Sequence, residues 1–278
     1  MSPSGKYFIF SGNAVGAAAQ FHKLDQLQNL NHVIPTLGAS ALPGTGGLSK
    51  GHAANYCYAV DQPRKRTLLA VRRIDTKAEG LTLADRWETD VEAEIEAVDV
   101  LEKLEIGLVK LHFNSSRKMD SENCEATIST KGSRIEGLRM GSVEAKIILD
   151  EEPLQYTSSK ENLADYYRKQ NSGWRSANAR RFGTLPDAAA VREVNGTVKF
   201  SLVREIQLIG KQDPEHEVRV QADGYTIKWD GFGRIILGEV FVKCCDRRVT
   251  MVRLHMGSDG GGSGSVGDGS SNGQTGTN

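Results

Sequence analysis

The sequence predicts a mainly β protein, folded as an antiparallel β-sandwich or a barrel-like pair of sheets. Residues 224–256 carry three runs of β-favouring residues separated by short polar turns, which is typical of an antiparallel meander. Acidic and apolar residues alternate strictly between Asp90 and Ala97, the period of a strand with one buried face. A chain of 278 residues can bury enough surface to be stable without disulfides or metal ions.

Composition argues against several classes of protein. Lysine plus arginine and aspartate plus glutamate number 35 each, so the overall charge favours neither nucleic acid nor an acidic membrane surface as partner. No stretch reaches the roughly 18 apolar residues of a transmembrane helix. The N-terminal apolar stretch is interrupted at Ser11, Gly12 and Asn13, unlike a cleaved signal, and four cysteines do not indicate a disulfide framework. These features favour a cytoplasmic protein, or one exported without a cleaved signal peptide.

The N-terminal third is expected to contain strands around one long loop. Residues 6–21 form a Gly/Ala-rich strand region, and residues 33–51 are so dense in Gly, Pro and Ser that they predict a loop. Residues 54–60 and 67–74 predict two strands joined by a tight turn. Because long loops in compact domains are often functional, the 33–51 segment is a place to look for a site.

The segment from Asp85 to Glu105 is acidic. As a strand, it places a row of carboxylates on one face, and we predict a partner-binding surface there. Its members are Glu92, Glu94 and Glu96, beside Asp90. The apolar residues of 91–105 also fit helical spacing, so a helix is an alternative, although the strand-like run at 106–113 favours a strand. Calcium sites usually draw ligands from loops, so a solvent-facing or partner-facing strand is the preferred interpretation.

One short α-helix is predicted at 159–171. Ser158 and Glu161 have the spacing of a capping box, and Gly173 follows the expected end. The helix and the residues after it are basic and aromatic, which predicts a second partner-binding surface. Its members are Arg168, Lys169, Trp174, Arg175, Arg180 and Arg181. Such residues also occur in single-stranded nucleic-acid sites, but the neutral overall charge argues against that partner.

The remaining sequence predicts a single β-rich domain over 1–256, with a subdivision near 150–158 left open. Further strands are expected at 134–149 and 198–209 before the closing meander. Residues 257–278 contain nine glycines and one apolar residue, Val266. Such a segment offers little to offset the entropy of ordering, so it predicts a flexible, disordered Gly/Ser-rich tail.

The sequence carries no local motif of catalysis or metal binding. The six histidines are scattered, and none lies two to four residues from another. A nucleophile elbow, a zinc-protease motif and a dinucleotide fingerprint are all missing. We therefore assign no catalytic residue, no metal ligand and no cofactor.

The leading functional hypothesis is a non-enzymatic binding or self-associating protein, whose partner is a second copy or another protein. The acidic segment 85–105 and the basic segment 160–181 are suited to pair between copies, which predicts an oligomer that salt weakens. A second hypothesis is a hydrolase whose carboxylates and histidine converge in space. A third is a membrane-active or pore-forming β protein.

Overall fold

A computed structural model of the chain describes residues 6–22, 31–61, 65–120, 126–151, 154, 198–210, 219–243, 246–257 and 261–277. These residues are almost entirely in antiparallel strands. The predicted helix at 159–171 lies outside them. Among the described residues there is no helix long and apolar enough to cross a membrane.

The first of two large sheets is built mostly from the first half of the chain. In spatial order its strands are β12 (Val203–Ile209), β10 (Val143–Leu149), β9 (Arg134–Met140), β7 (Leu104–Lys118), β6 (Arg86–Val100), β5 (Arg66–Thr82) and β4 (Gly47–Val60), and β8 (Thr127–Ser129) pairs with β7. Its long central strands follow one another along the chain as hairpins.

The second sheet combines both ends of the chain. Its order is β13 (Val220–Asp223), β14 (Thr226–Trp229), β15 (Gly233–Lys243), β16 (Asp246–Met256), β17 (Gly262–Ser271), β2 (Gly12–His22) and β3 (Asn31–Ala41), and β11 (Val198–Ser201) pairs with β15. Two further strands, β1 (Lys6–Ile9) and β18 (Gln274–Thr277), pair with each other. We call this pair the terminal ribbon.

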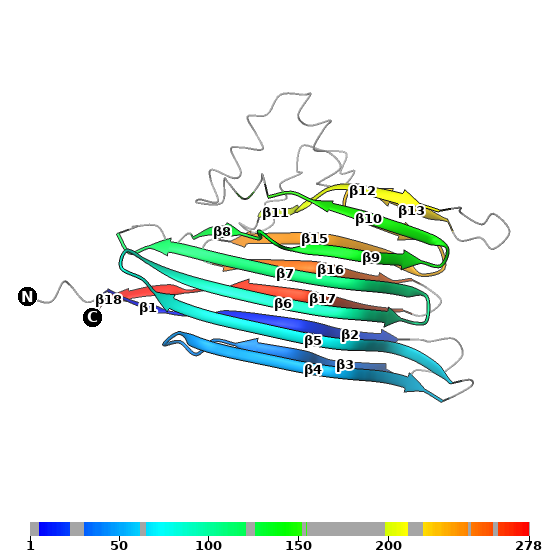
Figure 1. Ribbon diagram of the computed structural model, residues 1–278, viewed down its shortest axis with the longest axis horizontal. Coiled ribbons are helices and arrows are strands. Elements are labelled where there is room, and N and C mark those ends of the chain that lie inside the picture. Colours follow the sequence, from blue (N-terminus) through cyan, green and yellow to red (C-terminus); the bar gives the residue numbers. More distant parts are fainter. Residues whose placement is uncertain are drawn as a thin grey trace, which may run out of the picture.

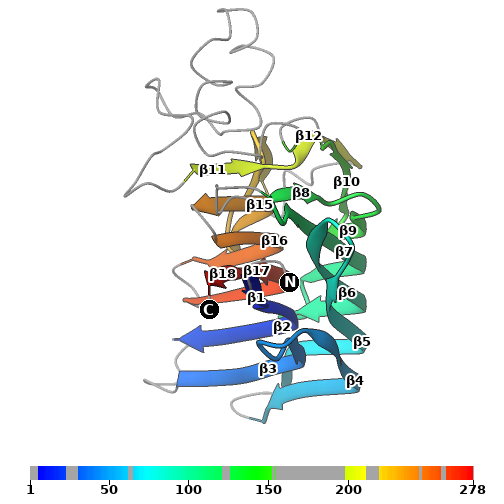
Figure 2. The same ribbon diagram turned by 90° about the vertical axis from the view of Figure 1, so that its left-hand side faces the viewer.

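The two sheets lie face to face and enclose one apolar core (Figures 1 and 2). The core draws Ile74, Ile95 and Leu111 from the first sheet and Phe21 and Val252 from the second. The mainly β, sandwich-like prediction is therefore confirmed. The strand interpretation of the acidic segment is also confirmed, because β6 buries Val91, Ala93 and Ile95 and turns the residues between them outward.

The expectation of a disordered tail at 257–278 is wrong. Residues 262–271 form β17, which lies between β16 and β2 in the interior of the second sheet, and residues 274–277 form β18. The physical reason is close approach: a Cβ built on Gly269 would lie 2.7 Å from Leu111 Cδ2 and 3.1 Å from Val91 Cγ1 of the facing sheet. The missing side chains thus allow the two layers to meet.

The expectation of a long loop at 33–51 is also wrong. Residues 31–41 and 47–60 are the strands β3 and β4, and only residues 42–46 connect them. Pro35 is tolerated in β3 because it falls at an irregularity of the register between β2 and β3, where it has no ladder partner.

Regular pairing is interrupted in each sheet along one row that crosses five strands, and we call each interruption a kink. At this row, each residue lies opposite a residue of the adjacent strand, but the two do not form a ladder pair. The row of the first sheet comprises Asn55, Arg72, Ala97, Gly107 and Gly137. The row of the second sheet comprises Gly38, Gly16, Gly267, Met251 and Gly238. On alternate strands of each row the backbone φ is positive, from 51° to 70°, which reverses the inward and outward alternation beyond the kink.

The two kinked rows pack against each other across the core. A Cβ on Gly16 or on Gly38 would lie 2.2 Å from Cγ2 of Ile74, two residues from the kink in β5. A Cβ on Gly267 would lie 3.0 Å from Cγ1 of Val109, two residues from the kink in β7. The interruptions of the two ladders therefore face each other across the core.

Candidate functional site

The outer face of the first sheet carries charges of both signs on β4 to β7. The three glutamates predicted to bind a partner all lie on this face and are partly exposed. Each has a basic neighbour on the adjacent strand: Glu92 Oε1 lies 3.2 Å from Lys77 Nζ, Glu94 Oε2 lies 2.9 Å from Lys110 Nζ, and Glu96 Oε2 lies 2.6 Å from Arg72 Nη2. The acidic row is thus balanced by bases within the same sheet.

A hollow of about 410 Å³ lies over the middle of this face. Its polar lining includes Lys50, His52, Asp75, Lys77, Glu94 and Lys110. Asp75 receives two partners, His52 Nδ1 at 2.8 Å and Arg73 Nε at 2.5 Å, and the hydrogen bond with His52 is the main cause that lowers the pKa of Asp75, with Arg73 adding to it against partial burial. The hollow is open and lined by both signs of charge, which suits a polar ligand or a partner's surface.

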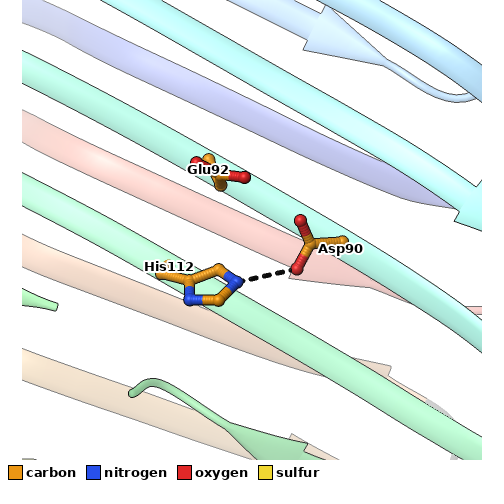
Figure 3. A group of neighbouring side chains, drawn as sticks. All are labelled: Asp90, Glu92 and His112. Carbon is orange, nitrogen blue, oxygen red and sulfur yellow. Dashed lines mark hydrogen bonds and ion pairs between the residues drawn. The ribbon is translucent and has the colours of Figure 1, made fainter. Parts of the chain in front are cut away.

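Beside the hollow, Asp90 on β6 and His112 on β7 form the most strongly perturbed pair on this face (Figure 3). Nε2 of His112 lies 2.9 Å from Asp90 Oδ1, and Nδ1 lies 2.8 Å from the carbonyl oxygen of Lys131. The hydrogen bond with Asp90 is the main cause that raises the pKa of His112 to about 9. Burial opposes ionisation of Asp90, but the hydrogen bond and charge of His112, with Lys77, lower the pKa of Asp90 to about 2.

Asp90, Glu92 and His112 are also the residues best placed to hold a metal ion. One ligand atom from each lies within 4.8 Å of the others. Two cationic groups, however, already pair with these carboxylates. One is the imidazolium of His112. The other is Lys77, whose Nζ lies 3.4 Å from Asp90 Oδ2 and 3.2 Å from Glu92 Oε1. A metal would have to displace both, so we interpret the cluster as an ion-pair network.

A second polar cluster lies on the outer face of the second sheet. Glu239 on β15 is buried and forms ion pairs with Lys199 and Arg253. Both bases lie over the ring of Phe241, at 5.1 Å and 5.5 Å from its centroid. Burial, and then the charge of Glu239, raise the pKa of Tyr225 to about 12. Because the buried carboxylate of Glu239 is paired with two partly exposed bases, we interpret this cluster as a structural network.

The long sides of β3 and β4 form a third surface, the β3–β4 edge. Figures 1 and 2 show the two strands side by side at the lower end of the sandwich. Side chains link them: His32 Nδ1 lies 3.1 Å from the Tyr58 hydroxyl, and the amide of Ala41 donates to Ser49 Oγ at 3.2 Å. Each strand is hydrogen-bonded to a described strand on one side only. This edge overlaps the segment 33–51 that was predicted as a loop.

The six basic and aromatic residues predicted to bind a partner lie outside the described residues. They are Arg168, Lys169, Trp174, Arg175, Arg180 and Arg181. The pair Asp90–His112 was not predicted, and for His52 a nearby carboxylate was considered in the hydrolase hypothesis without Asp75 being identified as that partner. Both pairs join different strands, 22 and 23 residues apart, so only the strand register brings them together.

Comparison with known families gives one match. A family model described as "Domain of unknown function (DUF8256)" matches residues 8–243, most of the chain. The chain belongs to this family. The match runs from within β1 to the last residue of β15, and it leaves out β16 and β17 although both are interior strands of the second sheet. No curated protein and no solved structure matches the chain.

Proposed function

We propose that this DUF8256 protein is a non-enzymatic, self-associating β-sandwich protein whose partner is a second copy, bound along the β3–β4 edge. The observation that carries the proposal is the length of the outermost strands at this edge. There β4 has 14 residues and β3 has 11, whereas at the opposite edge β12 has 7 and β13 has 4. A long outermost strand presents a row of backbone donors and acceptors, which favours pairing with another strand.

The composition of this edge supports pairing with an identical strand. β4 contains one lysine and no carboxylate, and β3 contains neither. Two apolar side chains are largely exposed there, Val33 at 59% and Leu48 at 54%. Two identical strands paired antiparallel are related by a two-fold axis, so the association closes as a dimer.

Features within the same strands limit how far the pairing extends. Pro35 lacks an N–H donor, and Asn55 interrupts β4 with a φ of 51°. Such features blunt an edge against open-ended aggregation. They leave residues 47–54 of β4 as the longest regular stretch, and we assign the strand pairing to it, within a contact that extends along the β3–β4 edge.

The test is light scattering of the purified chain with substitutions at the exposed apolar positions. Wild-type protein is expected to have the mass of two copies, and the double variant Val33→Lys with Leu48→Lys the mass of one, since paired copies would bring the new charges together. The matched control is Ile209→Lys on β12, at the opposite edge and 52% exposed, which is expected to leave the dimer intact. Substitutions at such exposed sites typically change stability by less than about 0.5 kcal/mol.

The effect of salt concentration on the dimer distinguishes this contact from one formed by opposite charges. Because the acidic row of β6 is paired with bases inside the sheet, we expect the dimer to persist at high salt. A wild-type monomer, or a dimer unaffected by the double substitution, contradicts the proposal. If instead the dimer dissociates at high salt and the double variant is still a dimer, the contact lies between the acidic segment 85–105 and the basic segment 160–181.

A hydrolytic site in the hollow is the second candidate, and the dyad His52–Asp75 supports it. A carboxylate that orients a histidine is the arrangement of a general base. The described lining of the hollow offers no serine or cysteine, and its one threonine, Thr76, is buried, so we assign water as the nucleophile. The control is His255→Ala, at an exposed position of β16 in the other sheet. Hydrolysis of simple chromogenic esters or glycosides that His52→Ala abolishes and His255→Ala leaves intact would favour this candidate, and a protein inactive on both classes would remove support for it.

A further inference from the structure

Arg117 is a buried charge near the end of β7. It lies on the face of the first sheet that is turned towards the interior, and only 5% of its surface is exposed. The paired residues on this face of β6 and β7 change from apolar to polar towards the end of the strands. Successive inward pairs are Val91 with Phe113, Thr89 with Ser115, and Trp87 with Arg117.

The terminal ribbon covers this end of the face. Phe8 of β1 stacks on Trp87 with ring centroids 5.0 Å apart, and Nη2 of Arg117 donates to Oγ1 of Thr275 in β18 at 3.1 Å. Phe8 and Thr275 are register partners in the ribbon, as Trp87 and Arg117 are in the sheet. Two pairs therefore lie one over the other, and the end-on view of Figure 2 shows β1 and β18 across this end, between the two sheets.

The remaining donors of the guanidinium are unused. Nε and Nη1 of Arg117 are buried and meet no hydrogen-bond acceptor in the described parts of the chain. An arginine stays protonated in proteins, and a buried charge without a counter-charge is strongly unfavourable. Buried arginines are therefore expected to be paired with a carboxylate or another anion.

We propose that Arg117 holds a small inorganic anion, such as chloride or phosphate, enclosed between the terminal ribbon and the first sheet. The anion accepts hydrogen bonds from Nε or Nη1, while Nη2 keeps its bond to Thr275. It supplies the negative charge that the guanidinium lacks. The next inward pair along β6 and β7 is Thr89 with Ser115, and both residues are buried and carry hydroxyl groups.

The site also bears on how the terminal ribbon is held. A two-stranded sheet is only marginally stable alone in water. The ribbon depends on Phe8 packing against Trp87 and on Thr275 bonding to Arg117. An anion bound to the same arginine beneath the ribbon should therefore stabilise the packing of the ribbon against the sheet.

The test is thermal unfolding of the full chain at constant ionic strength, with chloride or inorganic phosphate replacing bulky gluconate. We expect a saturable rise in Tm of about 2–4 °C for the wild type. Arg117→Met is expected to lose this rise and, in gluconate, to unfold at a Tm no lower than that of the wild type, because it removes an uncompensated buried charge. The control is Arg139→Met on β9, an exposed arginine whose removal leaves the rise unchanged.

The proposal is overturned if the wild type shows no saturable rise, or if Arg117→Met shows the same rise as the wild type. If Arg117→Met does not fold, hydrogen exchange of the wild type decides. Greater protection of the amides of Phe8 and Thr275 in chloride or phosphate than in gluconate supports an ion beneath the ribbon. Equal protection overturns it.

Discussion

β6 and β17 face each other across the core, each inside its own sheet, yet their sequences have almost nothing in common. β6 alternates apolar residues with charged ones, so its buried and exposed faces are visible in the chain. β17 is made of glycine and serine, with Val266 and Asp268 as its two larger residues. Both are nonetheless paired along their length on both sides.

The difference shows two ways to specify an interior strand. β6 contributes side chains that fill the core, including Val91 and Ile95. β17 contributes space: Gly269 meets the side chains of Val91 and Leu111 where a larger residue would collide with them. The large residues of β6 and β7 and the small residues of β17 are therefore complementary halves of one packing arrangement.

Removal of residues 258–278 should have the largest effect on this arrangement. It deletes β17 and separates β16 from β2, which splits the second sheet and exposes its apolar face. We expect the truncated chain to lose cooperative thermal unfolding, as followed by circular dichroism, or to be insoluble. A truncated protein with the Tm of the full chain would mean that β17 is a dispensable tail.

Gly269→Val tests the close approach of the two layers. The new side chain overfills the space between β17 and the facing strands, and we expect a loss of about 1–3 kcal/mol in the free energy of unfolding in urea. The control is Ser263→Val, an exposed position on the same strand, which should change stability little. Equal losses of stability at both positions would contradict this explanation and assign the loss to the strand propensity of valine alone.

Opposite substitutions at the kinked rows compare the two strands directly. Gly267 in β17 has a φ of 70° and Ala97 in β6 a φ of 51°. Gly267→Ala should destabilise the protein by about 1–2 kcal/mol, because L-residues are strained in this conformation. Ala97→Gly relieves the same strain at an exposed position, and after the entropy cost of glycine we expect a gain below about 1 kcal/mol. Urea unfolding measures both, and a destabilised Ala97→Gly would indicate that the kink in β6 is not strained.

The pair Asp90–His112 should give the smallest effect, a pH dependence of the free energy of unfolding. The folded pKa of His112 is raised from 6.5 to about 9, so its contribution is complete below about pH 6.5 and is lost as the pH rises through 9. The folded pKa of Asp90 is lowered from 3.8 to about 2, so its contribution is present above about pH 4 and is lost as the pH falls through 2. The pair therefore stabilises the fold most between about pH 4 and pH 6.5.

His112→Gln should remove this contribution, by no more than about 1 kcal/mol since both groups are partly exposed to solvent. The loss in the free energy of unfolding should be larger at pH 6 than at pH 10. His22→Gln, on β2, is the control. A His112→Gln loss that is the same at both pH values would assign His112 a packing role instead.

Side-chain patterns predicted the meander of β14 to β16 and, with the strand-like run at 106–113 deciding against a helix, β6 and the outward position of Glu92, Glu94 and Glu96. They were not enough to predict the partners of these glutamates. Lys77, Lys110 and Arg72 lie on neighbouring strands, and which base meets which acid depends on register. The same holds for Asp90 with His112, where neither residue has a local signal of its own.

The sequence by itself determined the β class and the inward and outward faces of its patterned strands, because those properties follow from the order of side chains along a few residues. Only the tertiary structure decided that residues 262–271 are an interior strand and that 33–51 belong to two outermost ones. Tertiary structure also placed Arg117 beneath the paired strands β1 and β18. Glycine carries no pattern of its own, so whether it forms a strand or a loop depends on the large side chains that pack against it from the opposite sheet.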